Sequence, residues 1–175
     1  MTDDTEYLYV VDYADDAERK RVEYLFNNWS GGRIDRPEGV VRLASDVDHE
    51  QVYERLISKV PEEQVRAYRL EEDRAEVSPA TRTVELTVPA KADAVETFVQ
   101  YMLSKRKAVL QSATHNEYEM YTKKGRATTT YELDDEGNGS GTTVRLRITG
   151  YSDAPAFLAE FFETELTDYA ASQRS

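Results

Sequence analysis

Residues 142–151, Thr-Thr-Val-Arg-Leu-Arg-Ile-Thr-Gly-Tyr, decide how this chain folds. Apolar and polar side chains alternate along them, with Val144, Leu146 and Ile148 on one side and with Arg145, Arg147 and Thr149 on the other. An alternation with a period of two predicts a β-strand that has one buried face and one face in water. Because antiparallel sheets often have such a wet face, the stretch predicts an antiparallel sheet.

The neighbouring residues extend this sheet. Two further strands are predicted before it, at 118–121 and 127–133, with turns at Lys124-Gly125 and at residues 134–141. A final helix is predicted to start at Ser152 or Asp153, because Pro155 suits its first turn. Its apolar stripe consists of Phe157, Leu158, Phe161, Phe162, Leu166 and Tyr169. We expect this stripe to cover the sheet and to bury Phe157, Phe161 and Phe162.

The first two thirds of the chain alternate between strand and helix patterns. Strands are predicted at 6–12, 39–44, 64–71 and 81–88, the last two forming a pair. One helix is expected after Asp12 or Asp15 and a third at 90–110. Between them, a capping box of Ser45 and Asp48 predicts a second helix, which is expected to bury Val52, Leu56, Ile57 and Val60. The sequence therefore predicts an α+β fold with a largely antiparallel sheet of about seven strands and about four helices. We expect one domain over residues 1–175, and Pro89 is the best candidate for a boundary.

The composition is acidic along the whole chain. It holds 34 Asp and Glu against 22 Lys and Arg, a net charge of −12, and only 7 of the basic residues are Lys. An even spread of carboxylates suits a protein in molar salt, where the screening length is only ~3 Å. The composition resembles that of small acidic cytoplasmic proteins of haloarchaea. This resemblance implies a salt-rich cytoplasm and no particular activity.

The composition also limits the functional classes. The chain has no Cys, which excludes disulfides, thiolate nucleophiles and Cys-based metal sites. It has no apolar run near the ~20 residues of a membrane span. The first residues are acidic where a secretion signal is basic and then apolar, so we expect a cytoplasmic protein without membrane contact.

Catalytic and metal motifs are weak in the sequence. His49 lies among Asp46, Asp48 and Glu50, but carboxylates in the first turn of a helix already stabilise its positive end. No nucleophile motif is present. The glycines at 137, 139 and 141 are spaced as in a phosphate-binding loop, but they follow three acidic residues, which would repel a phosphate. The sequence thus predicts no cofactor, no metal and no catalytic set, and it favours a non-catalytic binding or regulatory module over an enzyme.

Positive charge is concentrated in one part of the chain. Residues 90–130 carry seven basic and four acidic residues, whereas both flanking parts are acidic. Six of the basic residues form two clusters: Lys105, Arg106 and Lys107, and Lys123, Lys124 and Arg126. If the predicted sheet packs beside the helix at 90–110, the clusters meet and form an anion-binding patch. Nucleic acid is a weaker alternative partner, because six cations are few and salt weakens phosphate contacts. Each cluster also has a structural interpretation, as cations at a helix end and at a hairpin tip.

Aromatic residues gather on the last three predicted strands. The candidates for a ligand site are Tyr118, Met120, Tyr121, Tyr131 and Tyr151. A curved antiparallel sheet that holds a long C-terminal helix resembles the helix-grip (START-like) fold over residues 115–170. This resemblance implies a carrier of a small ligand, with a cavity lined by Tyr and Met. The alternative is that these side chains cover the edge of the core and turn their hydroxyls to water.

The first predicted strand is apolar on both faces. Tyr7, Tyr9 and Val11 alternate with Leu8 and Val10. Such a strand is either central in the sheet or paired at its edge with another chain. The sequence therefore leaves two interpretations open: burial within one chain, or a homodimer in which Tyr7, Tyr9 and Tyr13 meet a second copy.

The even spread of carboxylates predicts that salt stabilises the folded chain. Screening weakens the repulsion among them, so we expect the melting temperature to rise steadily from ~0.1 M to molar KCl. Thermal unfolding followed by circular dichroism measures this dependence. Equal stability at both salt concentrations would contradict the prediction.

Overall fold

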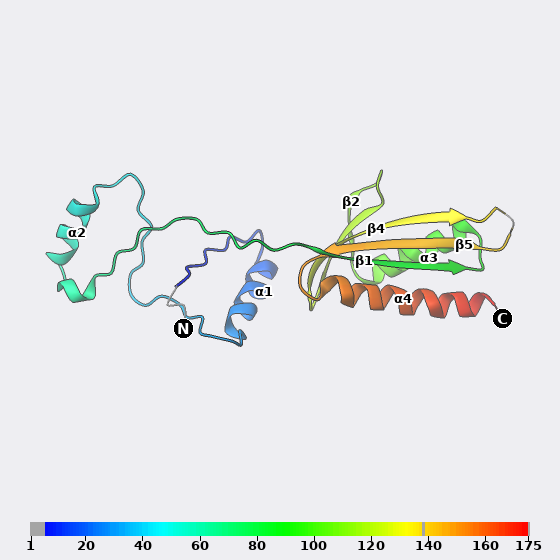
Figure 1. Cartoon of the computed structure of the whole chain (residues 1–175), viewed down its shortest axis with the longest axis horizontal. Helices are drawn as coiled ribbons and strands as arrows, with labels where there is room; N and C mark the ends of the chain where they lie inside the picture. Colours follow the sequence, from blue (N-terminus) through cyan, green and yellow to red (C-terminus); the bar gives the residue numbers. More distant parts are fainter. Residues whose placement is uncertain (1–5, 138, 175) are drawn as a thin grey trace. The chain divides into compact units, whose positions relative to one another are not determined.

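A computed structural model describes residues 6–137 and 139–174 of the chain. The contacts divide the chain into two compact units, one up to Leu70 and the other from Glu71 onward (Figure 1). Pro89, the boundary expected from the sequence, directly follows the first strand of the second unit.

The second unit is built on one antiparallel sheet. Its strands lie in the order β1-β5-β4-β3-β2 and every neighbouring pair is antiparallel. The strand bounds are β1 (Ala80–Val88), β2 (Val109–Ser112), β3 (Glu117–Thr122), β4 (Gly125–Asp135) and β5 (Thr142–Gly150). Together with the four α-helices of the described residues, this sheet confirms the predicted α+β class, with five strands instead of about seven.

Two helices cover the same face of the sheet. They are α3 (Ala92–Lys105) and α4 (Ala154–Gln173), and Figure 1 shows α4 running along β1. Val99 and Met102 of α3 and Phe162 of α4 belong to one buried cluster together with Leu146 of β5. The helices also contact each other, because the rings of Phe98 and Tyr169 stack with their centroids 4.1 Å apart.

The alternation at 142–151 appears in the structure as predicted. Val144, Leu146 and Ile148 are completely buried beneath the helices. Arg145, on the opposite face, reaches Glu85 of β1 at 2.8 Å and Glu132 of β4 at 3.4 Å. The polar face of the sheet is thus stabilised by cross-strand charge pairs, each of which contributes little because it is exposed.

The final helix begins where the sequence predicted, with Pro155 in its first turn. Only one of the three phenylalanines expected to be buried is fully buried. Phe162 has no exposed surface, whereas Phe157 and Phe161 are half-buried. The reason is geometric: Phe162 faces the sheet, while the other two rings lie beside the end of α3, where cationic side chains cover them.

Three predicted strands are wrong. The segments at 6–12, 39–44 and 64–71 are not part of any sheet, and residues 64–71 do not pair with 81–88. Instead, β1 pairs along its whole length with β5. A β-type pattern shows that a segment suits a pleated surface, but it does not supply the partner strand that a ladder needs.

The third helix is shorter than predicted, and a strand follows it. Lys107 has a φ of 54°, so the chain leaves the helical path there and continues as β2. The N–H of Ala108 donates to the carbonyl of Leu103 at 3.0 Å and the N–H of Lys107 to that of Ser104 at 2.9 Å. These two bonds form a Schellman motif, in which glycine usually occupies the position of Lys107. The missing glycine explains why the sequence pattern did not mark this end.

The first unit contains α1 (Asp16–Asn27), α2 (His49–Ile57) and a short 3₁₀ turn, η1 (Glu62–Gln64). Asp15 caps α1 by accepting from the N–H of Glu18 at 2.8 Å. Asp48, instead of Ser45, caps α2 by accepting from the N–H of Gln51 at 3.1 Å. The burial predicted for residues 52–60 is wrong, because none of residues 6–70 is buried. Local capping forms these helices without a core of their own.

No helix of the described residues combines the length and the apolar character that a membrane crossing requires.

Lys107 offers a direct test of the turn that ends α3. A non-glycine residue at positive φ costs on the order of 1 kcal/mol, so Lys107→Gly should raise the free energy of unfolding by ~1 kcal/mol. Lys107→Ala is the matched control, since it removes the charge but keeps the Cβ, and we expect no gain from it. Urea unfolding of both variants measures the difference; equal effects of Gly and Ala would refute this account.

Candidate functional site

The two basic clusters lie at neighbouring corners of the second unit. Lys105 ends α3 and Arg106 is its C-cap residue. Lys123 and Lys124 form the turn between β3 and β4. This hairpin packs against the start of α4, because a Cβ placed on Gly125 would lie 3.5 Å from the Cβ of Ala154.

Cationic side chains from both clusters lie over the same aromatic ring. The guanidinium carbon of Arg106 is 5.0 Å from the ring centroid of Phe157 and 4.1 Å from that of Phe161. The ammonium of Lys123 lies 5.4 Å from the centroid of Phe157. These distances are within the range of cation–π attraction. We call Arg106, Lys123, Phe157 and Phe161 the cation–aromatic cluster.

Other predicted anion-binding residues already have acidic partners. The ammonium of Lys105 lies 2.9 Å from a carboxylate oxygen of Glu165, and this hydrogen bond raises the pKa of Lys105. Arg126 forms an ion pair with Glu119 at 3.5 Å, and both belong to the polar face of the sheet. These two cations therefore offer little charge to a further anion. Lys107 and Lys124 stand beside the cluster without an ion pair to any described residue.

Arg106 differs from the other cations of the two clusters because one of its hydrogen-bond donors is buried without a partner. Its Nε is buried and lacks a partner, and no other side-chain nitrogen of Arg106 bonds to a described residue. A guanidinium has five N–H donors in a fixed fork, and a buried donor without a partner costs roughly 1–3 kcal/mol. The guanidinium carbon lies over two aromatic rings, and a guanidinium binds carboxylates and phosphates through its N–H groups.

The predicted ligand-binding residues do not form one group. Tyr118, Met120 and Tyr131 are on the core side of β3 and β4, and the rings of the two tyrosines stack with centroids 6.3 Å apart. Tyr121 is exposed on the opposite face of β3, and Tyr151 is exposed after β5.

A polar side chain of α3 joins the two core-side tyrosines. The amide Nε2 of Gln100 donates to the hydroxyl of Tyr131 at 2.8 Å and to that of Tyr118 at 3.1 Å. The hydroxyl of Tyr131 in turn donates to Glu96 at 3.2 Å. Burial raises the pKa of Tyr131, because it disfavours the phenolate. This network ties α3 to the sheet.

The more pronounced hollows of the described residues lie elsewhere. One of about 330 Å³ lies at the ends of β4 and β5 and is lined by Glu132, Leu133, Asp134, Thr143 and Arg145. Another, of about 200 Å³, lies beside α1 in the first unit. Neither is lined by any of the five predicted ligand-binding residues.

Two of the three acidic residues around His49 belong to the start of α2, Asp48 as its cap and Glu50 in its first turn. Asp48 is engaged as the cap of α2, and the ring of His49 lies 6.0 Å from that of Tyr53. Among the residues that the structure describes, no three His, Asp or Glu side chains gather as metal ligands would.

Sequence reasoning placed Phe157 and Phe161 only in the core and missed their role as supports for cations. Their spacing of four residues puts both rings on one side of α4, which the pattern itself shows. That Arg106 and Lys123 lie over these rings depends on how α3, the hairpin and α4 meet, so no local pattern reports it.

Comparison of the chain with protein-family models, with curated proteins and with solved structures finds no match.

The raised pKa of Tyr131 predicts a loss of stability at alkaline pH. Between the unfolded pKa, about 10, and the higher folded value, the folded state keeps a proton that the unfolded state releases. Stability therefore falls as the pH rises above about 10. Tyr131→Phe lacks this contribution, but at neutral pH it loses its hydrogen bonds, worth about 1 kcal/mol. We expect the difference in the free energy of unfolding between Tyr131→Phe and the wild type to become smaller from pH 8 to pH 11.

Urea midpoints across this pH range measure the effect. Tyr151→Phe is the matched control: it removes an exposed hydroxyl and, because Tyr131 is still present, keeps the alkaline loss of the wild type. If the two proteins differ in stability by the same amount at every pH, Tyr131 is not the origin of the alkaline loss of stability.

Proposed function

We propose that this chain is a non-catalytic binding module whose cation–aromatic cluster takes a single anionic group, a carboxylate or a phosphate, from a small ligand. One observation carries the proposal: the guanidinium of Arg106 lies over the rings of Phe157 and Phe161, and its Nε has no hydrogen-bond partner among the described residues. A guanidinium that is already held in place loses little conformational entropy when a ligand binds. More of the favourable interaction free energy therefore contributes to the affinity.

The charges around the cluster favour one anionic group over a polyanion. Glu165 neutralises Lys105, and Glu119 pairs with Arg126 on the polar face of the sheet, so few cations are left in a continuous row. The net charge of −12 repels nucleic acid over most of the surface. A nucleic-acid partner is therefore the weaker candidate. A large carrier cavity also has little support, because the described hollows do not involve the predicted tyrosines.

A binding role without catalysis agrees with the chemistry of the cluster. The cluster consists of two cations and two phenylalanine rings, and it contains no carboxylate, imidazole or hydroxyl group. We also propose the cytoplasm of a salt-adapted cell as its setting, on the composition alone. In molar salt, weak exposed charge pairs are screened, whereas a partly buried guanidinium keeps more of its attraction.

Titration of the whole chain with inorganic phosphate and, separately, with acetate in molar KCl tests the proposal. The Nε–H signal of Arg106 in ¹⁵N-resolved NMR spectra should shift and saturate with one of these anions. Arg106→Gln should weaken binding by about tenfold or more, the range expected for one charge-assisted pair. Arg126→Gln is the matched control, since it removes an exposed arginine that is already paired.

The outcomes separate the candidates. Binding that is lost in Arg106→Gln and kept in Arg126→Gln supports the proposal, provided that circular dichroism shows both variants folded. Lys123→Gln should also weaken binding, although it leaves the guanidinium of Arg106 in place. No saturable response to either anion overturns the proposal. If the chain instead binds an oligonucleotide in a salt-sensitive way, and changing Lys105, Arg106 and Lys107 together to Ala abolishes this binding, the nucleic-acid alternative replaces the proposal.

A further inference from the structure

Residues 7–13, Tyr-Leu-Tyr-Val-Val-Asp-Tyr, form an extended segment without a strand beside it. No backbone-to-backbone hydrogen bond joins this segment to another described residue. Tyr9, Val11 and Tyr13 lie on the side of α1, where they line the hollow of about 200 Å³. The ring of Tyr9 lies 6.3 Å from that of Phe26. One face of the segment is thus partly covered, and both of its hydrogen-bonding edges are open.

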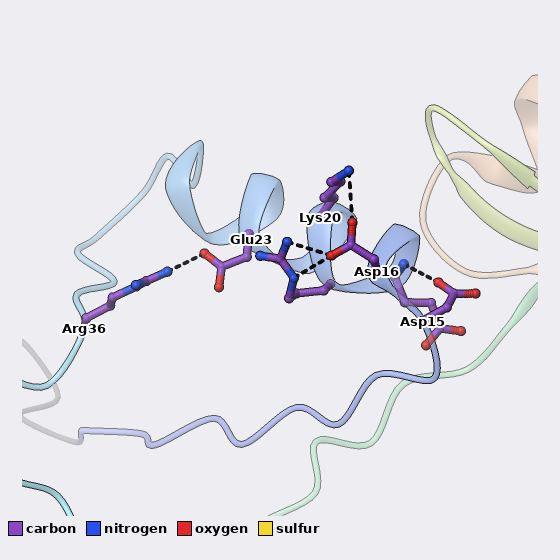
Figure 2. Close-up of polar contacts among 7 residues, drawn as sticks. Asp15, Asp16, Lys20, Glu23 and Arg36 are labelled. Atoms are coloured by element: carbon purple, nitrogen blue, oxygen red, sulfur yellow. Dashed lines mark hydrogen bonds and ion pairs between the residues drawn. The ribbon is translucent and has the colours of Figure 1, made fainter.

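Most charged side chains of α1 already have partners within the unit. Figure 2 shows Asp15 at the cap, Asp16 bound to Lys20 at 3.0 Å, and Glu23 bound to Arg36 at 2.6 Å. These contacts leave the apolar side chains of α1 and of the extended segment as the part of the surface that has no partner.

The first unit exposes many apolar side chains on the segment and on α1. Val10 is 80% exposed, and the three tyrosines of the segment are 54–63% exposed. Tyr24, Leu25 and Trp29 of α1 are also exposed. A half-exposed aromatic side chain presents about 100 Å², and a standard interface takes roughly 800 Å² from each partner. The segment supplies part of this area, and the exposed apolar side chains of α1 in the same unit are available for the rest.

The order of residues in the segment makes it complementary to itself. When two copies run antiparallel with Val10 opposite Val10, Tyr7 lies opposite Tyr13 and Tyr9 opposite Val11. Aromatic pairs and aromatic–β-branched pairs are the favourable cross-strand neighbours. All the side chains of these two types of pair lie on the face turned toward α1.

Charge selects this register over a nearby one. A slip that centres the pair on Tyr9 would set Glu6 opposite Asp12, and like charges directly opposite each other destabilise a strand pair. With Val10 at the centre, Asp12 lies opposite Leu8 and no acidic side chain faces another. The near-palindromic order therefore fits a second copy of the same chain.

We propose that residues 7–13 pair antiparallel with the same residues of a second copy, about a two-fold axis that passes through Val10. The pairing satisfies the open backbone edge and forms a two-stranded ribbon with the tyrosines of both copies on one face. It is an isologous contact, the commonest way in which soluble proteins close a dimer. This dimer is independent of the anion-binding proposal, because it uses no residue of the second unit.

Cysteine cross-linking tests the register in the full chain, which has no cysteine of its own. In the proposed dimer the Cα atoms of the two Val10 residues lie ~4.5–5.5 Å apart, which a disulfide spans. Val10→Cys should therefore form a covalent dimer under mild oxidation in molar KCl. Val40→Cys is the matched control, since Val40 is 82% exposed in another extended segment. Leu8→Cys should cross-link with Asp12→Cys and not with itself.

Light scattering gives an independent measurement at tens of micromolar protein. We expect the wild type at twice the chain mass of 20.0 kDa and Val10→Pro at the mass of one chain, because proline removes a donor and blocks the pairing. Val40→Pro should keep the doubled mass. A wild-type mass of 20.0 kDa, or equal cross-linking of Val10→Cys and Val40→Cys, overturns the proposal.

Discussion

The second unit depends on the central position of β5, which pairs with β1 along one edge and with β4 along the other. Nine residues of β5 are in register with β1, and the same nine are in register with β4. These pairings join a strand from early in the unit to the hairpins that follow α3, and they produce one continuous apolar face. Both α3 and α4 bury their apolar sides against that face. Without β5, neither helix would have a surface to cover.

The cation–aromatic cluster is a consequence of this packing. The turn at Lys107 ends α3 near the first turns of α4, and the β3–β4 hairpin reaches the same place because Gly125 packs closely against Ala154. Arg106 and Lys123 then share the ring of Phe157. Two like charges come together because the ring offers each of them an attractive face, and the result is a preorganised donor group at the margin of the core.

The two units differ in how much of their apolar surface they bury. The second unit buries its apolar face within itself, whereas none of residues 6–70 is buried. In the first unit, Asp15 and Asp48 satisfy helix ends locally, and ion pairs such as Glu23–Arg36 fix the link that follows α1. Such contacts are exposed and contribute little stability. Association with a second copy, as proposed, would bury apolar side chains of this unit. The self-complementary order of residues 7–13 provides one partner for them.

The sequence by itself determined the elements whose signal is local. Side-chain period and the needs of helix ends predict the alternation at 142–151, the strands at 81–88, 118–121 and 127–133, and the start of α4 beside Pro155. For the cap of α1 the sequence left Asp12 and Asp15 open, and the structure has Asp15. It also marked the six basic residues from which the cation–aromatic cluster takes Arg106 and Lys123. Only the tertiary structure decided which segments with a β-type pattern find a partner strand, since pairing depends on residues far away in the chain. Packing likewise decided that α3 stops at Lys105 without a glycine and that Arg106 lies between Phe157 and Phe161, because these features arise where three elements meet.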